Sequence, residues 1–112
     1  MTDPLIVSGK SIPLDKEGYL ANLEDWTPQI AECLAEREGI QLSPRHWEVL
    51  NLVREFYDGH GLSPMMRVIV KQMKITYGDE KGSSMYLLSL FPEYPALIAT
   101  KIAGLPRPTN CP

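Results

Sequence analysis

Prolines and glycines divide this chain into short helical segments, and that punctuation constrains its fold more than any other feature. Ser43-Pro44 and Ser63-Pro64 each place a hydroxyl side chain before a proline. Such a pair favours a helix start, because the serine oxygen accepts from free backbone amides and the proline has no amide to leave unpaired. After each pair, apolar residues recur every three or four positions, as on one face of a helix. The two predicted helices end at Gly59 and Gly78.

Three further segments complete a mainly α prediction. Each has a helix-starting residue, a short apolar run and a proline or glycine that ends it. Their boundaries are Asp25 or Thr27 with Gly39, Ser83 or Ser84 with Pro92, and Pro95 with Ala103. The links between segments are short, which indicates a compact bundle of about five helices.

The N-terminal region has a different, β-type pattern. Leu5-Ile-Val and Ser11-Ile-Pro-Leu are β-compatible runs on either side of Ser8-Gly9-Lys10. Gly9 suits the positive φ of a tight turn, and Pro13 limits its strand to an edge because it has no amide to donate. We therefore predict a small β-hairpin at about residues 5–14, supported by the helices.

Size and composition indicate one globular unit. The chain has 112 residues, of which 44% are hydrophobic and 22% charged, and its formal net charge is -3. An acidic chain does not bind a polyanion such as tRNA or DNA tightly without help. Met1-Thr2-Asp3-Pro4 does not resemble an export signal and no apolar run reaches membrane-spanning length, so we expect a cytoplasmic protein. We predict a helical domain at 1–103, with helices at about 26–103, and a flexible arm at 104–112.

The arm carries the residue that we predict to be chemically active, Cys111. The chain after Gly104 reads Leu-Pro-Arg-Pro-Thr-Asn-Cys-Pro, and its prolines exclude a regular helix. An extended arm of this length spans at most roughly 25 Å and can carry a thiol to another protein. Lys101 and Arg107 favour the reactive thiolate and the terminal carboxylate at Pro112 opposes it, so the residues alone leave the sign of the net effect open. The alternative is an incidental cysteine.

Other candidate residues are weaker. Cys33 shares an apolar stripe with Ile30 and Leu34 and is predicted to be structural, the alternative being a thiol that pairs with Cys111. His46 and His60 lie in different segments, so no metal site is expected. The sequence contains no phosphate-binding loop of the kind that would indicate a nucleotide cofactor. Arg67, Lys71 and Lys74 form a cationic helix stripe, either simply solvated or a contact for an acidic partner or an anionic persulfide.

Several motifs resemble those of the DsrC/TusE family of sulfur carriers. The most specific is Ala99-Thr-Lys-Ile-Ala-Gly-Leu-Pro-Arg-Pro-Thr-Asn-Cys111-Pro, which is similar to the family's C-terminal arm. Supporting motifs are Gly18-Tyr-Leu with Asp25-Trp26, Leu42-Ser-Pro-Arg-His-Trp-Glu-Val-Leu50 and Ser63-Pro-Met-Met-Arg67. The resemblance implies a helical bundle with a helix-turn-helix-like core, a small N-terminal hairpin and no cofactor.

The same resemblance implies a chemical role. Cys111 would accept a sulfane sulfur as a persulfide and pass it on, as a carrier-type sulfurtransferase. Family members acting with dissimilatory sulfite reductase have a second arm cysteine, where this chain has Thr100. That difference favours the branch that relays sulfur to 2-thiouridine at the wobble position of tRNA. Residues expected to shape the arm or contact partners are Lys101, Pro106, Arg107, Pro108 and Arg67.

The implied partners are a donor complex of the TusBCD kind and a tRNA thiouridylase of the MnmA kind with bound tRNA. Three alternatives stay open within and outside the family. One is a single-cysteine DsrC-like protein of dissimilatory sulfur oxidation or sulfite reduction. Another is a DNA-binding regulator built on the helix-turn-helix-like core, although the negative charge disfavours DNA binding. The third is a purely structural interaction module, which would leave the cysteine arm without a use.

Overall fold

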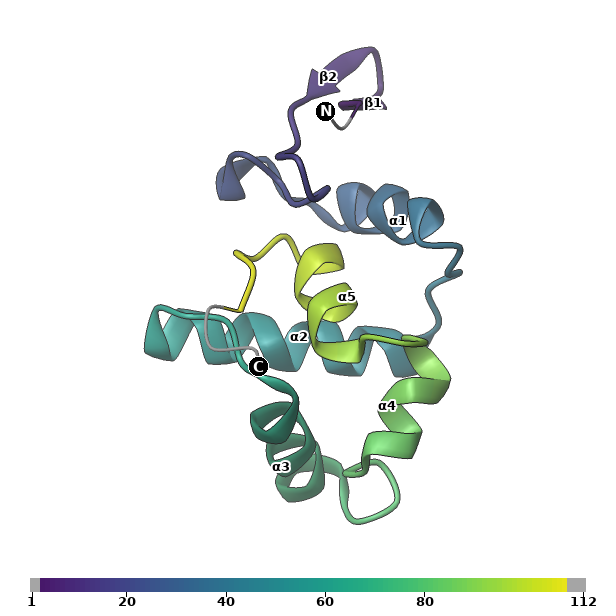
Figure 1. Ribbon diagram of the computed structural model, residues 1–112, viewed down its shortest axis with the longest axis vertical. Coiled ribbons are helices and arrows are strands. Elements are labelled where there is room, and N and C mark those ends of the chain that lie inside the picture. The colour runs from purple at the N-terminus through teal and green to yellow at the C-terminus, as the bar shows by residue number, and fades with distance from the viewer. Residues whose placement is uncertain (1–2, 109–112) are drawn as a thin grey trace.

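A short antiparallel hairpin is followed by five α-helices in the computed structural model, which describes residues 3–108 (Figure 1). The prediction of a mainly α bundle with an N-terminal hairpin is confirmed. A 3-10 turn, Leu23–Asp25, lies between the hairpin and the first helix. The strands and helices are β1 Leu5–Val7, β2 Lys10–Ile12, α1 Pro28–Arg37, α2 Pro44–His60, α3 Met66–Tyr77, α4 Ser84–Leu90 and α5 Pro95–Ile102.

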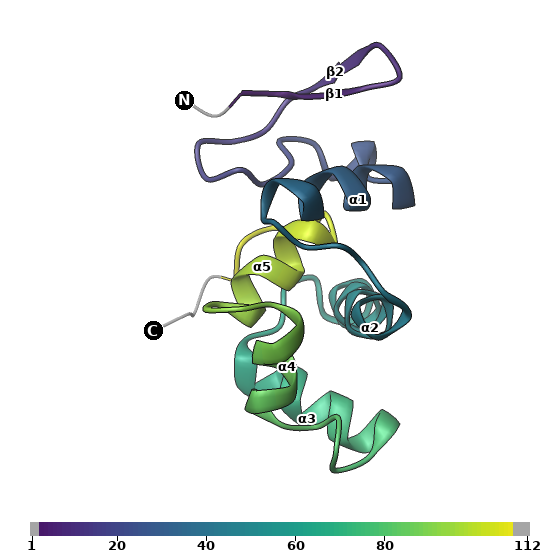
Figure 2. The same ribbon diagram turned by 90° about the vertical axis from the view of Figure 1, so that its right-hand side faces the viewer.

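The hairpin is shorter than predicted. β1 and β2 pair with Leu5 opposite Ile12, and the pairing ends there because Pro13 has no amide to extend the ladder. Ser8 and Gly9 have φ angles of 51° and 79°, so both central turn residues adopt the left-handed conformation of a tight hairpin turn. The hairpin packs on α1 (Figure 2).

Side-chain caps confirm three of the predicted helix starts. Thr27, and not Asp25, accepts from the Ile30 amide at 3.2 Å and caps α1. Ser43 caps α2, and Ser83 caps α4 through the Tyr86 amide at 3.1 Å. These caps lie within a few residues of their partners, which is why the sequence alone identifies them.

Two predicted helix boundaries are wrong. α3 begins at Met66, not at Ser63-Pro64, and its N-cap residue Met65 has no side-chain cap. The Ser63 hydroxyl instead donates to the Pro106 carbonyl, in the segment after α5. α2 continues through Gly59 to His60 and ends where Gly61 adopts a φ of 72°. Of the two nearby glycines, Gly61 is the one in the left-handed conformation that ends a helix.

The hydrophobic core surrounds α5, which packs against α1, α2, α3 and α4 (Figures 1 and 2). Ala99, Ile102 and Ala103 are essentially inaccessible to solvent, as are Leu34 of α1, Leu50 of α2, Met73 of α3 and Phe91 beside α4. The hairpin and α3 lie at opposite ends of the molecule. Within residues 3–108, no helix combines the length and apolar character required to cross a lipid bilayer.

Candidate functional site

The candidate site is built around the point where α5 ends and the C-terminal arm begins. We call residues 102–107 the arm root. The Gly104 amide donates to the Lys101 carbonyl and the Leu105 amide donates to the Thr100 carbonyl, both at 3.0 Å. Together with the φ of 75° at Gly104, these bonds form a Schellman-type helix end. The turn carries Leu105 back into the core, where it is buried.

Two side chains from other segments bind the last carbonyls of α5. Trp26 Nε1 donates to the Ile102 carbonyl at 2.9 Å, and Arg54 Nη1 donates to the Ala103 carbonyl at 2.6 Å. The Arg54 guanidinium also lies over the Trp26 ring, with Cζ 3.7 Å from the ring centroid. Burial lowers the pKa of Arg54 from its ordinary value, while Asp58 acts in the opposite direction. Arg54 therefore brings a partly desolvated cation to the end of α5.

Gly104 fits under the Trp26 ring because it has no side chain. A Cβ at this position would lie 2.2 Å from Trp26 Cδ1, far inside van der Waals contact. The positive φ of Gly104 independently disfavours other residues. Trp26 thus binds the Ile102 carbonyl through its indole N–H and covers Gly104 with its ring.

Two further contacts hold the segment beyond Gly104. The Ser63 hydroxyl donates to the Pro106 carbonyl at 2.5 Å, and Arg107 forms an ion pair with Glu17. Pro108 is buried. These contacts place residues 104–108, the first part of the predicted arm, against the domain. Cys111 lies outside the described residues, and the division into a domain at 1–103 and an arm at 104–112 stays a prediction.

The other predicted site residues divide into two groups. Lys101 Nζ lies 3.2 Å from Glu38 Oε2 and 5.2 Å from the Tyr19 ring centroid. Lys101 lines one surface pocket together with Glu17, the ion-pair partner of Arg107. The structure therefore brings Lys101, Pro106, Arg107 and Pro108 together around the arm root. Arg67 is exposed on α3 and has no ion pair within residues 3–108.

Trp26, Arg54 and Ser63 were not predicted as site residues. Their partners in the arm root lie 76, 49 and 43 positions away, and no local pattern encodes such contacts. Trp26 belongs to one of the motifs that support the family resemblance, but its indole N–H was not expected to bind the end of α5.

The two positions relevant to cysteine chemistry within the described residues, Thr100 and Cys33, both pack against the hydrophobic core. Thr100 is completely buried, and its hydroxyl donates to the Ala96 carbonyl at 2.8 Å, one turn earlier in α5. Cys33 is partly buried on α1 and packs against the core. Among residues 3–108, no group of three His, Cys, Asp or Glu side chains is arranged to hold a metal ion.

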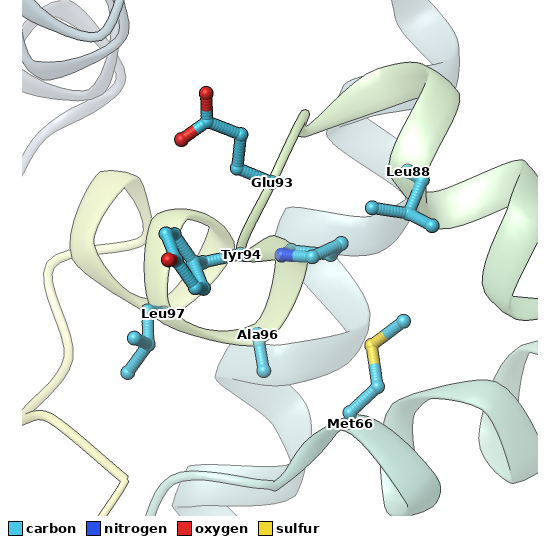
Figure 3. A pocket seen from close by; sticks show the side chains of 7 residues that line it. Met66, Leu88, Glu93, Tyr94, Ala96 and Leu97 are labelled. Carbon is cyan, nitrogen blue, oxygen red and sulfur yellow. The ribbon is translucent and has the colours of Figure 1, made fainter.

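An apolar hollow of 280 Å³ lies between the start of α3, α4 and the start of α5 (Figure 3). Met66, Leu88 and Tyr94 line it, and Tyr94 is 62% exposed. Glu93 lies at the edge of the hollow and has a φ of 72°. On either side of Glu93, the Tyr94 amide donates to the Pro92 carbonyl at 2.9 Å. This tight turn gives the loop between α4 and α5 a strained residue beside an apolar surface.

Comparison with known proteins identifies the class of this fold and site. The chain belongs to the family of DsrC-like proteins, whose family model matches residues 6–112. It is 52% identical over 107 residues to the sulfurtransferase TusE of Escherichia coli K12, covering 96% of this chain and 98% of that protein. A similar identity, 52% over 104 residues, relates it to sulfurtransferase TusE of Sodalis glossinidius, covering 93% of this chain and 96% of that protein.

The solved structures with this fold include DsrC proteins. The NMR structure of Allochromatium vinosum DsrC matches with a TM-score of 0.89 at 44% identity and covers 100% of both chains. These matches confirm the family resemblance and the fold that it implied.

Proposed function

We propose that this chain is a carrier-type sulfurtransferase that accepts a sulfane sulfur on Cys111 and passes it on for 2-thiolation of the tRNA wobble uridine. The observation that carries the proposal is the 52% identity to sulfurtransferase TusE over nearly the full length of both chains. The family model also extends through residue 112 and so includes Cys111. A sulfur-relay role in tRNA thiolation follows from this relationship.

The proposed chemistry needs one thiol and no cofactor. The Cys111 thiolate attacks the outer sulfur of a donor persulfide, R–S–SH. The donor's S–S bond breaks, R–S⁻ leaves, and Cys111 becomes the persulfide Cys–S–SH. The sulfane sulfur keeps its oxidation state and its proton, so the step requires no external oxidant or reductant. Thiol–disulfide exchange follows the same course of thiolate attack on a bonded sulfur.

The proposed partners are a TusBCD-like donor complex and an MnmA-like thiouridylase that holds the tRNA. The net charge of -3 supports delivery to tRNA through an enzyme that supplies the basic surface. Such a relay works in the cytoplasm. We assign Lys101, Pro106, Arg107 and Pro108 to shaping the arm and Arg67 to partner contact, which their positions around the arm root and on exposed α3 support.

The second candidate is a single-cysteine DsrC-like carrier of dissimilatory sulfur oxidation or sulfite reduction. The structural likeness to Archaeoglobus fulgidus DsrC, at 34% identity and a TM-score of 0.84, favours it. Thr100 occupies the position of the second arm cysteine and its hydroxyl is bonded within its own helix, so this candidate would also work through Cys111 alone. A DNA-binding regulator has little support, because α3 presents only three cations on a chain of net charge -3.

Intact mass spectrometry tests the proposal. The protein and its Cys111→Ser variant are incubated with a cysteine desulfurase, cysteine and a TusBCD-like relay, with and without reductant. We expect wild type to gain the mass of one sulfur atom and to lose it on reduction, and Cys111→Ser to gain none. Transfer of that sulfur to tRNA in the presence of the thiouridylase would establish the acceptor. A wild-type protein that gains no sulfur would refute the carrier role.

A further inference from the structure

Side chains from three separate segments converge on backbone carbonyls of the arm root. Trp26 precedes α1 and binds the Ile102 carbonyl, Arg54 comes from the middle of α2 and binds the Ala103 carbonyl, and Ser63 follows α2 and binds the Pro106 carbonyl. Each side chain binds a main-chain carbonyl. Together they therefore hold the path of the arm-root backbone, whatever side chains that backbone carries.

Ordinary helix capping does not account for all these contacts. The Schellman bonds from Gly104 and Leu105 already satisfy the carbonyls of Lys101 and Thr100. Trp26 and Arg54 then bind the next two carbonyls, and the two side chains stack on each other at 3.7 Å. Stacking limits the rotamers of both donors, because neither ring nor guanidinium can turn without losing the other. The result is a rigid clamp at the last turn of α5.

We propose that Trp26 and Arg54 are positioning residues for sulfur transfer, which set the direction in which the arm leaves the domain. The inference rests on the proposed function of Cys111. From Pro108, three residues reach Cys111 and span at most about 11 Å between Cα atoms. While residues 104–108 stay held, this span is therefore the limit on how far Cys111 can reach from Pro108.

Orientation matters because sulfur transfer joins two proteins. The thiolate must approach the donor's outer sulfur in line with the bond that breaks, and both proteins must be docked when it does. Misplacing a reacting group by about 1 Å can reduce such a rate by about 100-fold. A small, freely diffusing reagent approaches from any direction and does not share this requirement. The two reactions therefore separate positioning from the intrinsic reactivity of Cys111.

The test uses full-length protein in a Cys33→Ala background, so that Cys111 is the one remaining thiol. Trp26→Phe keeps an aromatic ring under Arg54 but removes the N–H that binds the Ile102 carbonyl. Arg54→Met removes the donor and charge, and Arg54→Lys restores a charge and one donor. His46→Ala is the matched control, because it breaks the 2.9 Å bond from His46 Nε2 to the Leu90 carbonyl, away from the arm root.

Two rates are measured for each variant: sulfur transfer from the persulfide-loaded TusBCD-like donor, followed by mass spectrometry, and alkylation of Cys111 by iodoacetamide. We expect Trp26→Phe and Arg54→Met to slow protein-to-protein transfer by about 10-fold or more while alkylation changes less than about twofold. Arg54→Lys should lie between Arg54→Met and wild type. Amide exchange at Gly104 and Leu105 should speed up in the clamp variants and stay slow in His46→Ala.

Several outcomes overturn the inference. Transfer and alkylation that fall together, an unchanged transfer rate, or root amides that stay as protected in Trp26→Phe as in wild type would each show that the clamp does not position the arm. An equal loss of transfer in His46→Ala would assign the effect to general instability. If wild type gains no sulfur, the proposed function itself is refuted. If wild type transfers sulfur normally and the Trp26 and Arg54 variants do the same, only the positioning role is refuted.

Discussion

The arm root and α3 use their cationic side chains in opposite ways. At the arm root, Arg54, Lys101 and Arg107 each bind a carbonyl or carboxylate of the chain itself. On α3, which contains no acidic residue, three cations are exposed and form no ion pair within residues 3–108: Arg67, Lys71 and Lys74. The contrast separates cations that hold the chain in place from cations that are available to another molecule.

The N-terminus of α3 also lacks a contact that the arm root has. Its candidate capping residue, Ser63, donates to the Pro106 carbonyl, and Met65 at the cap position makes no side-chain cap. A cap contributes about 1 kcal/mol to helix stability. The arm root is thus fixed by a residue that the local sequence would assign to α3. Four changes would break or sharpen this comparison.

Gly104→Ala should have the largest effect on stability. The new methyl group would lie 2.2 Å from Trp26 Cδ1, and alanine disfavours the φ of 75°. We expect a loss of about 2–4 kcal/mol in the free energy of unfolding, from overpacking and backbone strain together. Urea denaturation followed by circular dichroism measures it.

Gly82→Ala is the matched change beside α3, at a glycine that packs against Lys74. A Cβ at Gly82 would lie 2.3 Å from Lys74 Cβ and 2.4 Å from its backbone Cα, but no positive φ adds to the cost. We expect a smaller loss of about 1–3 kcal/mol, without faster amide exchange at Leu105. Equal losses with equal exchange at Leu105 would mean that the arm root is not an independent structural unit.

Ser63→Ala should have an intermediate effect. Ser63 is buried, and removing its hydroxyl leaves the Pro106 carbonyl without this donor. We expect a loss of about 1 kcal/mol, with chemical-shift changes centred on Leu105 and Pro106 and not on the first turn of α3. Ser83→Ala is the control, because it removes a true cap and should shift the Tyr86 amide instead. Changes confined to Met66 and its neighbours would show that Ser63 caps α3 after all.

Local contacts could be predicted from this sequence, and distant ones could not. Thr27, Ser43 and Ser83 each find a backbone amide three residues ahead, so the start of their helices is encoded within one turn. Ser63-Pro64 looks the same as Ser43-Pro44, yet the Ser63 hydroxyl binds a carbonyl 43 residues away. Only packing of the arm root beside the α2–α3 link decides between the two uses.

The candidate site divides along the same line. The motif of the arm identified Lys101, Pro106, Arg107 and Pro108, because the family resemblance is carried by consecutive residues. Trp26 and Arg54 recognise backbone carbonyls, which every residue possesses, so no residue type in the arm root indicates them. Their role follows from the three-dimensional structure alone.

Neutralising the α3 stripe should have the smallest effect on stability and a measurable effect on transfer. Arg67→Gln with Lys71→Gln removes two exposed cations that hold nothing within residues 3–108, so the free energy of unfolding should change by less than about 0.5 kcal/mol. If α3 contacts an anionic partner surface, sulfur transfer to the tRNA-loaded thiouridylase should slow by about 3- to 10-fold at low salt. High salt should remove most of the difference, because it screens exposed charges.

The control is Lys10→Gln with Arg45→Gln, which removes the same charge from two exposed positions on β2 and α2. If only net charge mattered, both double variants would slow transfer equally at low salt, and the assignment of Arg67 to partner contact would fail. A slower rate confined to the α3 variant, with unchanged alkylation of Cys111, would assign the partner contact to α3. It would also separate that contact from the arm root, where loss of a cation should alter the position of the arm at every salt concentration.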